Sequence, residues 1–213
     1  MTKLNYPSRS RIGGIPAIYV TLDPTVQVHR IYNASGLHPT KPREFRHFGP
    51  LDFRFDHHLI DPQDKPYDQD RGIMYLGKGD EAFTTCLGEV FQATKLIDRQ
   101  AKDPHYCVMT FKRDVQLLDL NSNFLTQIGA NTAIHSGPKD LTRMWSKILY
   151  DIYKQCDGIY YSSSMNCNQP AIALFERANN ATVLRPLINE NLNDPNMDQM
   201  VYAAAKKLGY QVL

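Results

Sequence analysis

Several features that would assign a protein to a broad class are missing from this sequence. No apolar run approaches the roughly 20 residues that span a bilayer, and the polar segment 1–8 lacks the apolar stretch of a signal peptide. The 24 basic and 22 acidic residues leave a net charge of only +2, so charge gives no reason to expect nucleic-acid or membrane binding. We therefore expect a cytoplasmic protein, in the producing cell or, after delivery as an effector, in a target cell.

Motifs for common cofactors and metals are also absent. The sequence has neither a Gly-x-Gly-x-x-Gly turn nor a Walker loop, so no Rossmann site or P-loop is indicated. His57 and His58 adjoin Asp56, but neighbouring side chains on a strand point to opposite faces and cannot easily share one ion. We expect no metal site, and we expect the cysteines, none of them in a Cys-x-x-Cys pair, to be reduced and mostly buried. The cysteines are Cys86, Cys107, Cys156 and Cys167.

The length of 213 residues and the ordinary apolar and charged content predict one globular domain with a substantial core. Residues 1–16 are rich in Pro, Gly, Ser and basic residues, and we expect them to form a loose arm before a core over about 17–213. Residues 36–71 hold many prolines and are expected to be irregular. A loop of that length inside a domain is usually functional or disordered.

Short segments rich in β-branched and aromatic residues predict strands, whereas apolar residues spaced three and four apart predict helices. The helices do not alternate regularly with the strands, so the fold class is α+β. Two strands, over 106–111 and 115–120, are expected to form a hairpin or to pair in another way. The other predicted strands cover 17–22, 27–32, 72–77, 158–163, 171–177 and 182–188, and the helices cover 80–96, 141–152 and 193–208, the last with Gly209 as its C-cap.

Arginine, glutamate and serine occur in that order at the edges of predicted elements. Arg30 lies in the second predicted strand, and Arg54 lies between two phenylalanines. Glu89 lies on the first predicted helix, and Ser163 lies in a run of three serines that ends a later strand. This pattern, over residues 28–177, resembles the RES-domain family, which is named for these three residues. The resemblance implies an ADP-ribosyltransferase-like fold of split antiparallel sheets with flanking helices, and chemistry on NAD as substrate without a metal.

The resemblance assigns the binding of NAD to arginines and aromatic residues. Arg30 and Arg54 match the two arginine motifs, and a guanidinium fork suits phosphate because it bonds two oxygens at once. Tyr75, in the strand before the glutamate helix, can stack on the cationic nicotinamide ring, and Tyr32 can support the same pocket. Each of these residues alone would more often be structural.

The resemblance assigns the chemistry to Glu89, together with Arg30 and Tyr75. Breaking the nicotinamide–ribose bond produces an oxocarbenium-like sugar, which a nearby carboxylate stabilises. At 100° per residue Glu89 lies roughly 120–140° from the centre of the apolar stripe of its helix, so it faces either a cleft or water. Ser163 matches the serine of a Tyr-x-Ser motif whose tyrosine is Tyr161, with the register open between it and its two serine neighbours.

Three functions are compatible with this pattern. The leading hypothesis is an NAD-degrading toxin that cleaves the nicotinamide–ribose bond, with water or phosphate as acceptor, and arrests growth. The first alternative is a mono-ADP-ribosyltransferase that modifies a protein, and the second is an inactive binding module. A toxin of this kind implies a separate antitoxin chain, Xre-like by the resemblance, that covers the active site.

Overall fold

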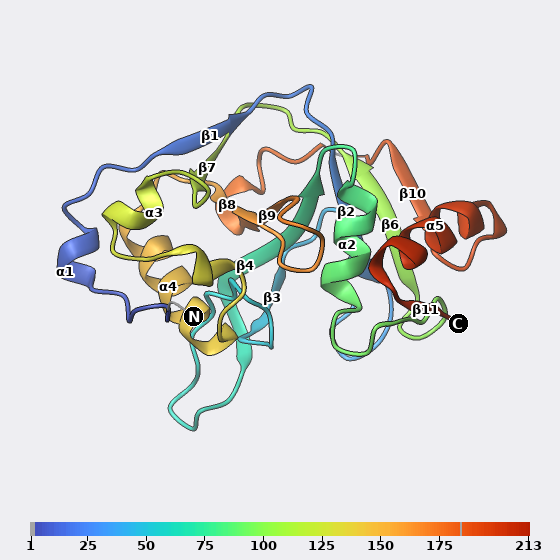
Figure 1. Ribbon diagram of the computed structural model, residues 1–213, viewed down its shortest axis with the longest axis horizontal. Helices are drawn as coiled ribbons and strands as arrows, with labels where there is room; N and C mark the ends of the chain where they lie inside the picture. Colours follow the sequence, from blue (N-terminus) through green and yellow to red (C-terminus); the bar gives the residue numbers. More distant parts are fainter. Residues whose placement is uncertain (1–2, 184) are drawn as a thin grey trace.

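A long sheet runs through the protein, with helices packed against it (Figure 1). The computed structural model describes residues 3–183 and 185–213. The strand order is β1-β7-β8-β9-β4-β2-β6-β10, with β3 paired to β4, and all neighbours are antiparallel except the parallel pair β7 and β8. The strands are β1 (Tyr19–Leu22), β2 (Val28–Asn33), β3 (Arg46–Gly49), β4 (Tyr67–Lys78), β6 (Pro104–Met109), β7 (Val115–Asp119), β8 (Gly158–Ser162), β9 (Pro170–Phe175) and β10 (Ile188–Asn191).

The helices divide between the two ends of the sheet. One core joins α1, α3 and α4 to β8 and β9, and another joins α2 and α5 to β2 and β6. A small parallel sheet of β5 and β11 lies beside α5. The bounds are α1 (Arg9–Ile12), α2 (Ala82–Val90), α3 (Phe124–Gln127), α4 (Lys139–Ile152), α5 (Asp198–Leu208), β5 (Leu96–Ile97) and β11 (Gln211–Val212), with short 3-10 turns at Thr132–His135, Glu176–Ala178 and Pro195–Met197.

The sheet splits between β2 and β4. These strands pair at only two positions, Val28 with Lys78 and His29 with Gly77. Beyond them β2 continues along β6 and β4 continues along β9, so the two strands diverge with their other edges hydrogen-bonded. Helix α2 packs close to the closed end of this fork, where a Cβ on Gly77 would lie 2.8 Å from the carbonyl oxygen of Ala82. The α+β class with a split, mostly antiparallel sheet is therefore confirmed.

Several predicted elements are also confirmed. Helix α4 covers the predicted segment 141–152. Helix α5 begins at Asp198 rather than at 193 and ends at Leu208, followed by Gly209, whose φ of +67° forms the expected left-handed C-cap. Three of the four cysteines are buried and all four are free thiols, with Cys167 exposed. Within residues 3–183 and 185–213, no helix combines the length and apolar character required to cross a membrane.

The predicted hairpin over 106–111 and 115–120 is wrong. Strand β6 lies between β2 and β10, whereas β7 lies between β1 and β8. The two strands are neighbours in sequence but belong to opposite halves of the split sheet, so the connection between them crosses from one half to the other.

The glutamate helix is shorter than predicted. Helix α2 ends at Val90, and the predicted continuation to 96 turns away and enters β5, where Leu96 pairs with Gln211. A strand pairing that is distant in sequence therefore overrides the local helical pattern. All seven residues over 82–88 are buried, so this helix packs on several sides rather than along one stripe.

The N-terminal segment is not a loose arm. The side chains of Leu4 and Ile12 are buried in the core, and the indole Nε1 of Trp145 donates to the carbonyl of Asn5 at 2.7 Å. The hydroxyl of Tyr153 donates to the carbonyl of Ile15 at 2.9 Å. The N-terminal segment therefore packs on the α4 side of the core through Leu4, Asn5 and Ile12.

Two further segments differ from the prediction. The region 36–71, expected to be irregular, contains β3 and the first part of β4. The predicted strand over 182–188 is reduced to a bridge between Phe111 and Thr182, and β10 begins only at Ile188. Position 184 lies outside the described residues.

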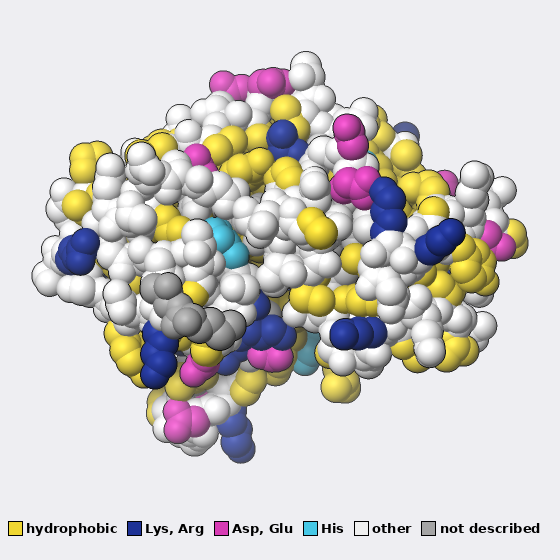
Figure 2. Space-filling view, in the orientation of Figure 1, with side chains coloured by type: hydrophobic (Ala, Val, Ile, Leu, Met, Phe, Trp, Pro, Cys, Tyr) yellow, Lys and Arg dark blue, Asp and Glu magenta, His cyan; other side chains and the backbone are white. Residues whose placement is uncertain are grey.

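The charges of the surface are mixed. Basic and acidic side chains are scattered over the face drawn in Figure 2 rather than gathered into one large area of a single sign. This distribution agrees with the small net charge of +2.

Among the glycines of the sheet, Gly158 leaves the least room for a side chain. An added Cβ would contact the carbonyl of Ala173 and lie 2.9 Å from the Cα of Leu174, both on β9. We expect Gly158→Ala to cost about 1–3 kcal/mol of unfolding free energy because the strands must separate. Urea unfolding measures the change. The control Gly14→Ala, whose Cβ meets nothing closer than 4.0 Å, should be near neutral, and equal effects of both substitutions would contradict the packing.

Candidate active site

A cleft of about 380 Å³ occupies the fork between the two diverging strands. One wall comes from β2 and the other from β4, and the end of α2 contributes Glu89. Residues 50–56, which we call the strap, also border the cleft and contribute Leu51, Phe53 and Arg54. Because the walls belong to different halves of the sheet, the cleft depends on the divergence of β2 and β4.

Glu89 lies half-buried in the last turn of α2 and faces this cleft. Its Oε1 accepts a hydrogen bond of 2.6 Å from the hydroxyl of Ser163. Burial raises the pKa of Glu89, whereas the Ser163 hydrogen bond and the positive charges of Arg54 and Lys139 oppose that rise. The structure thus combines a desolvated carboxyl with groups that favour its charged form.

Ser163 is the serine that meets the glutamate. It is fully buried just beyond β8, and its Oγ also accepts a hydrogen bond of 3.1 Å from the backbone N–H of Met165. Ser162 instead bonds the side chain of Asn121 at 2.9 Å, and Ser164 is exposed. The geometry therefore distinguishes the three serines, between which the sequence left the register open.

Arg54 lies on the strap and lines the same cleft as Glu89. Its Nη1 donates to the carbonyl of Gly137 at 2.6 Å, which fixes the side chain to the turn before α4. Burial lowers the pKa of Arg54 and the negative charge of Glu89 opposes that shift. The two side chains are thus electrostatic neighbours across the cleft.

Arg30 lies in the cleft wall, but its guanidinium is engaged by the protein itself. It is 5% exposed, and its Nη1 donates to the carbonyls of Lys41 and Pro42 at 3.0 and 2.8 Å. Its Nη2 donates to the hydroxyl of Thr40 at 3.3 Å, and burial lowers its pKa to about 10. In this arrangement Arg30 holds the loop over 40–42 against β2.

Aromatic rings line much of the cleft. The ring of Tyr75 lies 5.5 Å from that of Phe53, centroid to centroid, and Tyr161 contributes from β8. The hydroxyl of Tyr75 is buried and has no hydrogen-bond partner among the described residues. Tyr32 lines the cleft, but its hydroxyl donates to Asn189 at 2.8 Å and its ring stacks on His105.

The structure therefore brings the residues predicted from the sequence to one place. They differ in how far the protein itself already occupies their hydrogen-bonding groups. Arg30, Arg54 and Glu89 line the cleft with Tyr32 and Tyr75, whereas Ser163 lies behind Glu89 and contacts it directly. Three further residues of the cleft wall were not predicted as site residues: Arg46, Phe53 and Tyr161. Arg46 could have been noticed as an arginine between aromatic residues, had the segment 36–71 been recognised as containing a strand.

The paired histidines lie outside any strand and their rings are 5.4 Å apart, centroid to centroid, so the predicted strand alternation does not apply to them. His57 stacks on Tyr150 with 4.2 Å between ring centroids, whereas Nδ1 of His58 is hydrogen-bonded to the carboxylate of Asp56. Among the described residues, no group of three or more His, Cys, Asp or Glu side chains is placed to hold a metal ion.

Comparisons with known proteins place the fold. No protein-family model matches the chain, and no curated protein matches it. Among solved structures, a chain of the crystal structure of the M. tuberculosis MbcT–MbcA toxin–antitoxin complex is similar, with a TM-score of 0.53 and 15% sequence identity. The match covers 92% of this chain and 96% of that chain. At this identity the likeness establishes a shared fold.

The raised pKa of Glu89 predicts how stability depends on pH. The folded protein binds this proton more tightly than the unfolded chain, so the stabilisation is present below the unfolded pKa of about 4.3 and is lost as pH rises through the folded pKa. Glu89→Gln, which carries no charge, should therefore be more stable than the wild type at pH 7, with an advantage that shrinks towards pH 4. Urea unfolding between pH 4 and pH 8 measures this.

Glu81 provides the control on the same helix. Its hydrogen bond with Lys207 lowers its pKa, so Glu81→Gln should show no stabilisation at pH 7. A Glu89→Gln variant less stable than the wild type at pH 7 would contradict the electrostatic description.

Proposed function

We propose that this protein is an NAD-degrading toxin that cleaves the nicotinamide–ribose bond. The observation that carries the proposal is the Glu89 carboxylate, which Ser163 holds in a cleft shared with Arg54 and several aromatic rings. Heterolysis of this bond places positive charge on the ribose, and one fixed carboxylate beside the sugar lowers the barrier. The cleft volume of about 380 Å³ is within the range of small-molecule sites.

Each remaining side chain has a role in this proposal. Arg54 uses one nitrogen for Gly137, and the rest of its fork suits a phosphate of the dinucleotide. Tyr75, beside Phe53, offers an aromatic face for the nicotinamide ring. Arg30, bonded to the 40–42 loop, supports the wall and adds positive potential.

The toxin assignment rests on two likenesses. The order of arginine, glutamate and serine resembles the RES-domain family, and the fold is similar to a chain from a toxin–antitoxin complex. Because one fold can host different functions, the likeness supports the class of protein and the site supports the chemistry. A separate antitoxin chain, Xre-like by the family resemblance, would then cover the cleft.

Glu89→Gln tests the chemistry. We expect the kcat/KM for nicotinamide release from NAD to fall by about 10²–10³ because the variant cannot stabilise a cationic sugar. Chromatographic assay of free nicotinamide measures the change. Glu81→Gln, at the other end of α2 and outside the cleft, should keep wild-type activity.

The same assay separates the alternatives. Release from NAD alone indicates hydrolysis, and release that depends on added phosphate indicates phosphorolysis. Release that requires cell extract, with labelled protein bands, indicates ADP-ribosyl transfer instead. No turnover and no rise in Tm with NAD would overturn the proposal and favour an inactive binding module.

Ser163→Ala tests how the carboxylate is held. The hydroxyl donates to a charged acceptor, and loss of such a bond costs about 1.5–3 kcal/mol, so we expect kcat/KM to fall at least about tenfold. Ser162→Ala is the matched control because Ser162 bonds Asn121 and not Glu89. Equal losses in both variants would show that Ser163 has no special role.

A further inference from the structure

The strap over residues 50–56 carries Phe53 and Arg54 into the cleft but has little regular structure of its own. Its internal backbone bonds are Phe53 N–H to Leu51 O at 2.9 Å and Asp56 N–H to Phe53 O at 3.4 Å. An irregular segment with few backbone bonds keeps a fixed shape only where side chains hold it. The position of Arg54 therefore depends on what anchors the strap.

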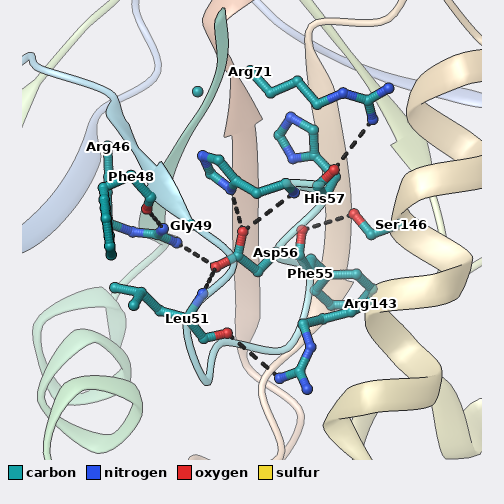
Figure 3. A network of polar contacts seen from close by, with 12 residues as sticks. Arg46, Phe48, Gly49, Leu51, Phe55, Asp56, His57, Arg71, Arg143 and Ser146 are labelled. Atoms are coloured by element: carbon teal, nitrogen blue, oxygen red, sulfur yellow. Dashed lines mark hydrogen bonds and ion pairs between the residues drawn. The ribbon is translucent and has the colours of Figure 1, made fainter. Parts of the chain in front are cut away.

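Asp56 links the end of the strap to its beginning through a hydrogen bond with Leu51. Its side chain is fully buried, and its Oδ2 accepts a hydrogen bond of 2.7 Å from the backbone N–H of Leu51, five residues earlier (Figure 3). The same oxygen accepts a hydrogen bond of 2.7 Å from Nη2 of Arg46, and Oδ1 is bonded to Nδ1 of His58. One carboxylate thus joins both ends of the strap to β3.

The charge of this carboxylate is well supported. Burial alone would raise the pKa of Asp56, but the hydrogen bond with His58 and the charge of Arg46 outweigh burial and lower the pKa to about 2. Arg46 is itself fixed, because its Nη1 donates to the carbonyl of Phe48 on β3. The anchor is therefore an ion pair between two immobilised groups.

Helix α4 holds the outer side of the strap. The hydroxyl of Ser146 donates to the carbonyl of Phe55 at 2.7 Å, and Arg143 donates to the carbonyl of Leu51 at 3.4 Å (Figure 3). These bonds fix the backbone on either side of Arg54. On the sheet side, Phe55 packs on Tyr161 of β8, and Asp56 supplies the strap's hydrogen bond to Arg46 of β3.

We propose that Asp56 is a positioning residue that holds the strap so that Arg54 and Phe53 face Glu89 across the cleft. The inference rests on the proposed cleavage of NAD. Asp56 acts through the backbone of Leu51 and through Arg46, without contact with the substrate. A displacement of about 1 Å in a binding group can cost about 10²-fold in rate, so a small movement of the strap is sufficient to impair catalysis.

Asp157 provides a matched control elsewhere in the protein. It is also buried, accepts hydrogen bonds from Arg113 at 2.8 and 2.9 Å, and accepts one of 2.9 Å from the backbone N–H of Gln116. It does not line the cleft. Substitution of either aspartate by alanine removes an arginine ion pair and one backbone hydrogen bond. The Arg113 side chain is 41% exposed and that of Arg46 is 11% exposed, and Asp56 also bonds His58.

The first measurement is the kinetics of NAD cleavage. We expect Asp56→Ala to lower kcat/KM by about 10²-fold and Asp157→Ala to stay within about threefold of the wild type. Asp56→Asn should recover most of the loss, because its amide oxygen still accepts from Leu51 and Arg46, and its NH₂ donates to a His58 protonated on Nε2. Equal losses in the two alanine variants would overturn the inference.

The second measurement is amide hydrogen exchange by NMR, which does not need activity. The Leu51 amide should exchange at least about tenfold faster in Asp56→Ala than in Asp157→Ala, and the Gln116 amide should show the reverse. Equal rates at Leu51 in both variants would overturn the anchoring role. A wild-type protein that does not cleave NAD would overturn the proposed function and the catalytic consequence, while the exchange rates would still decide whether Asp56 holds the strap.

Discussion

The fork between β2 and β4 is the constraint on which the rest of this structure depends. Two residue pairs join the strands. Beyond them, β2 forms its backbone hydrogen bonds with β6, and β4 forms its own with β9. The strands can separate because each keeps a hydrogen-bonded neighbour on its other edge. Their divergence therefore leaves few backbone N–H and C=O groups without a partner. Helices pack against each half of the sheet in separate clusters, a further cluster joins β2 and β6 to β4 and β9, and the space between the diverging strands becomes the cleft.

Within that cleft, opposing effects act on the charge of one residue, Glu89. Burial disfavours the charge of Glu89, whereas Ser163 and Arg54 favour it. The protein thus keeps a carboxyl where it costs stability, which is typical of sites at which function outweighs stability. Two other buried ionic groups, Arg30 and Asp56, have hydrogen-bond partners within the protein. Arg30 is satisfied by backbone carbonyls and Asp56 by Arg46, so both contribute to shape, and Glu89 is left as the carboxylate that faces the cleft.

The sequence predicted those parts of the fold that are decided locally. The periodicity of α4 and α5, the C-cap at Gly209 and the strand character of β8 and β9 are all local signals. The order of motifs also predicted that Glu89 and Ser163, 74 residues apart, belong to one site, and the structure places them in contact.

Long-range pairing decided the rest of the fold. The end of α2 was misplaced because β5 pairs with β11, and the hairpin was wrong because the fork separates β6 from β7. Tertiary contacts also decide how residues 40–42 bind Arg30 and how the strap positions Arg54. Such contacts leave no periodic pattern in the sequence.

The narrow junction at Val28 and His29 has a mechanical consequence. Backbone pairing joins the two halves there at only two positions, and side-chain packing between β2 and β6 on one side and β4 and β9 on the other completes the junction. A molecule that bridges both walls would stiffen the whole protein and would lose conformational entropy in doing so. A second molecule that also needs the walls held at that spacing would then bind at a smaller entropic cost. Two molecules bound at separate points along the cleft would therefore each change the affinity of the other through the width of the cleft.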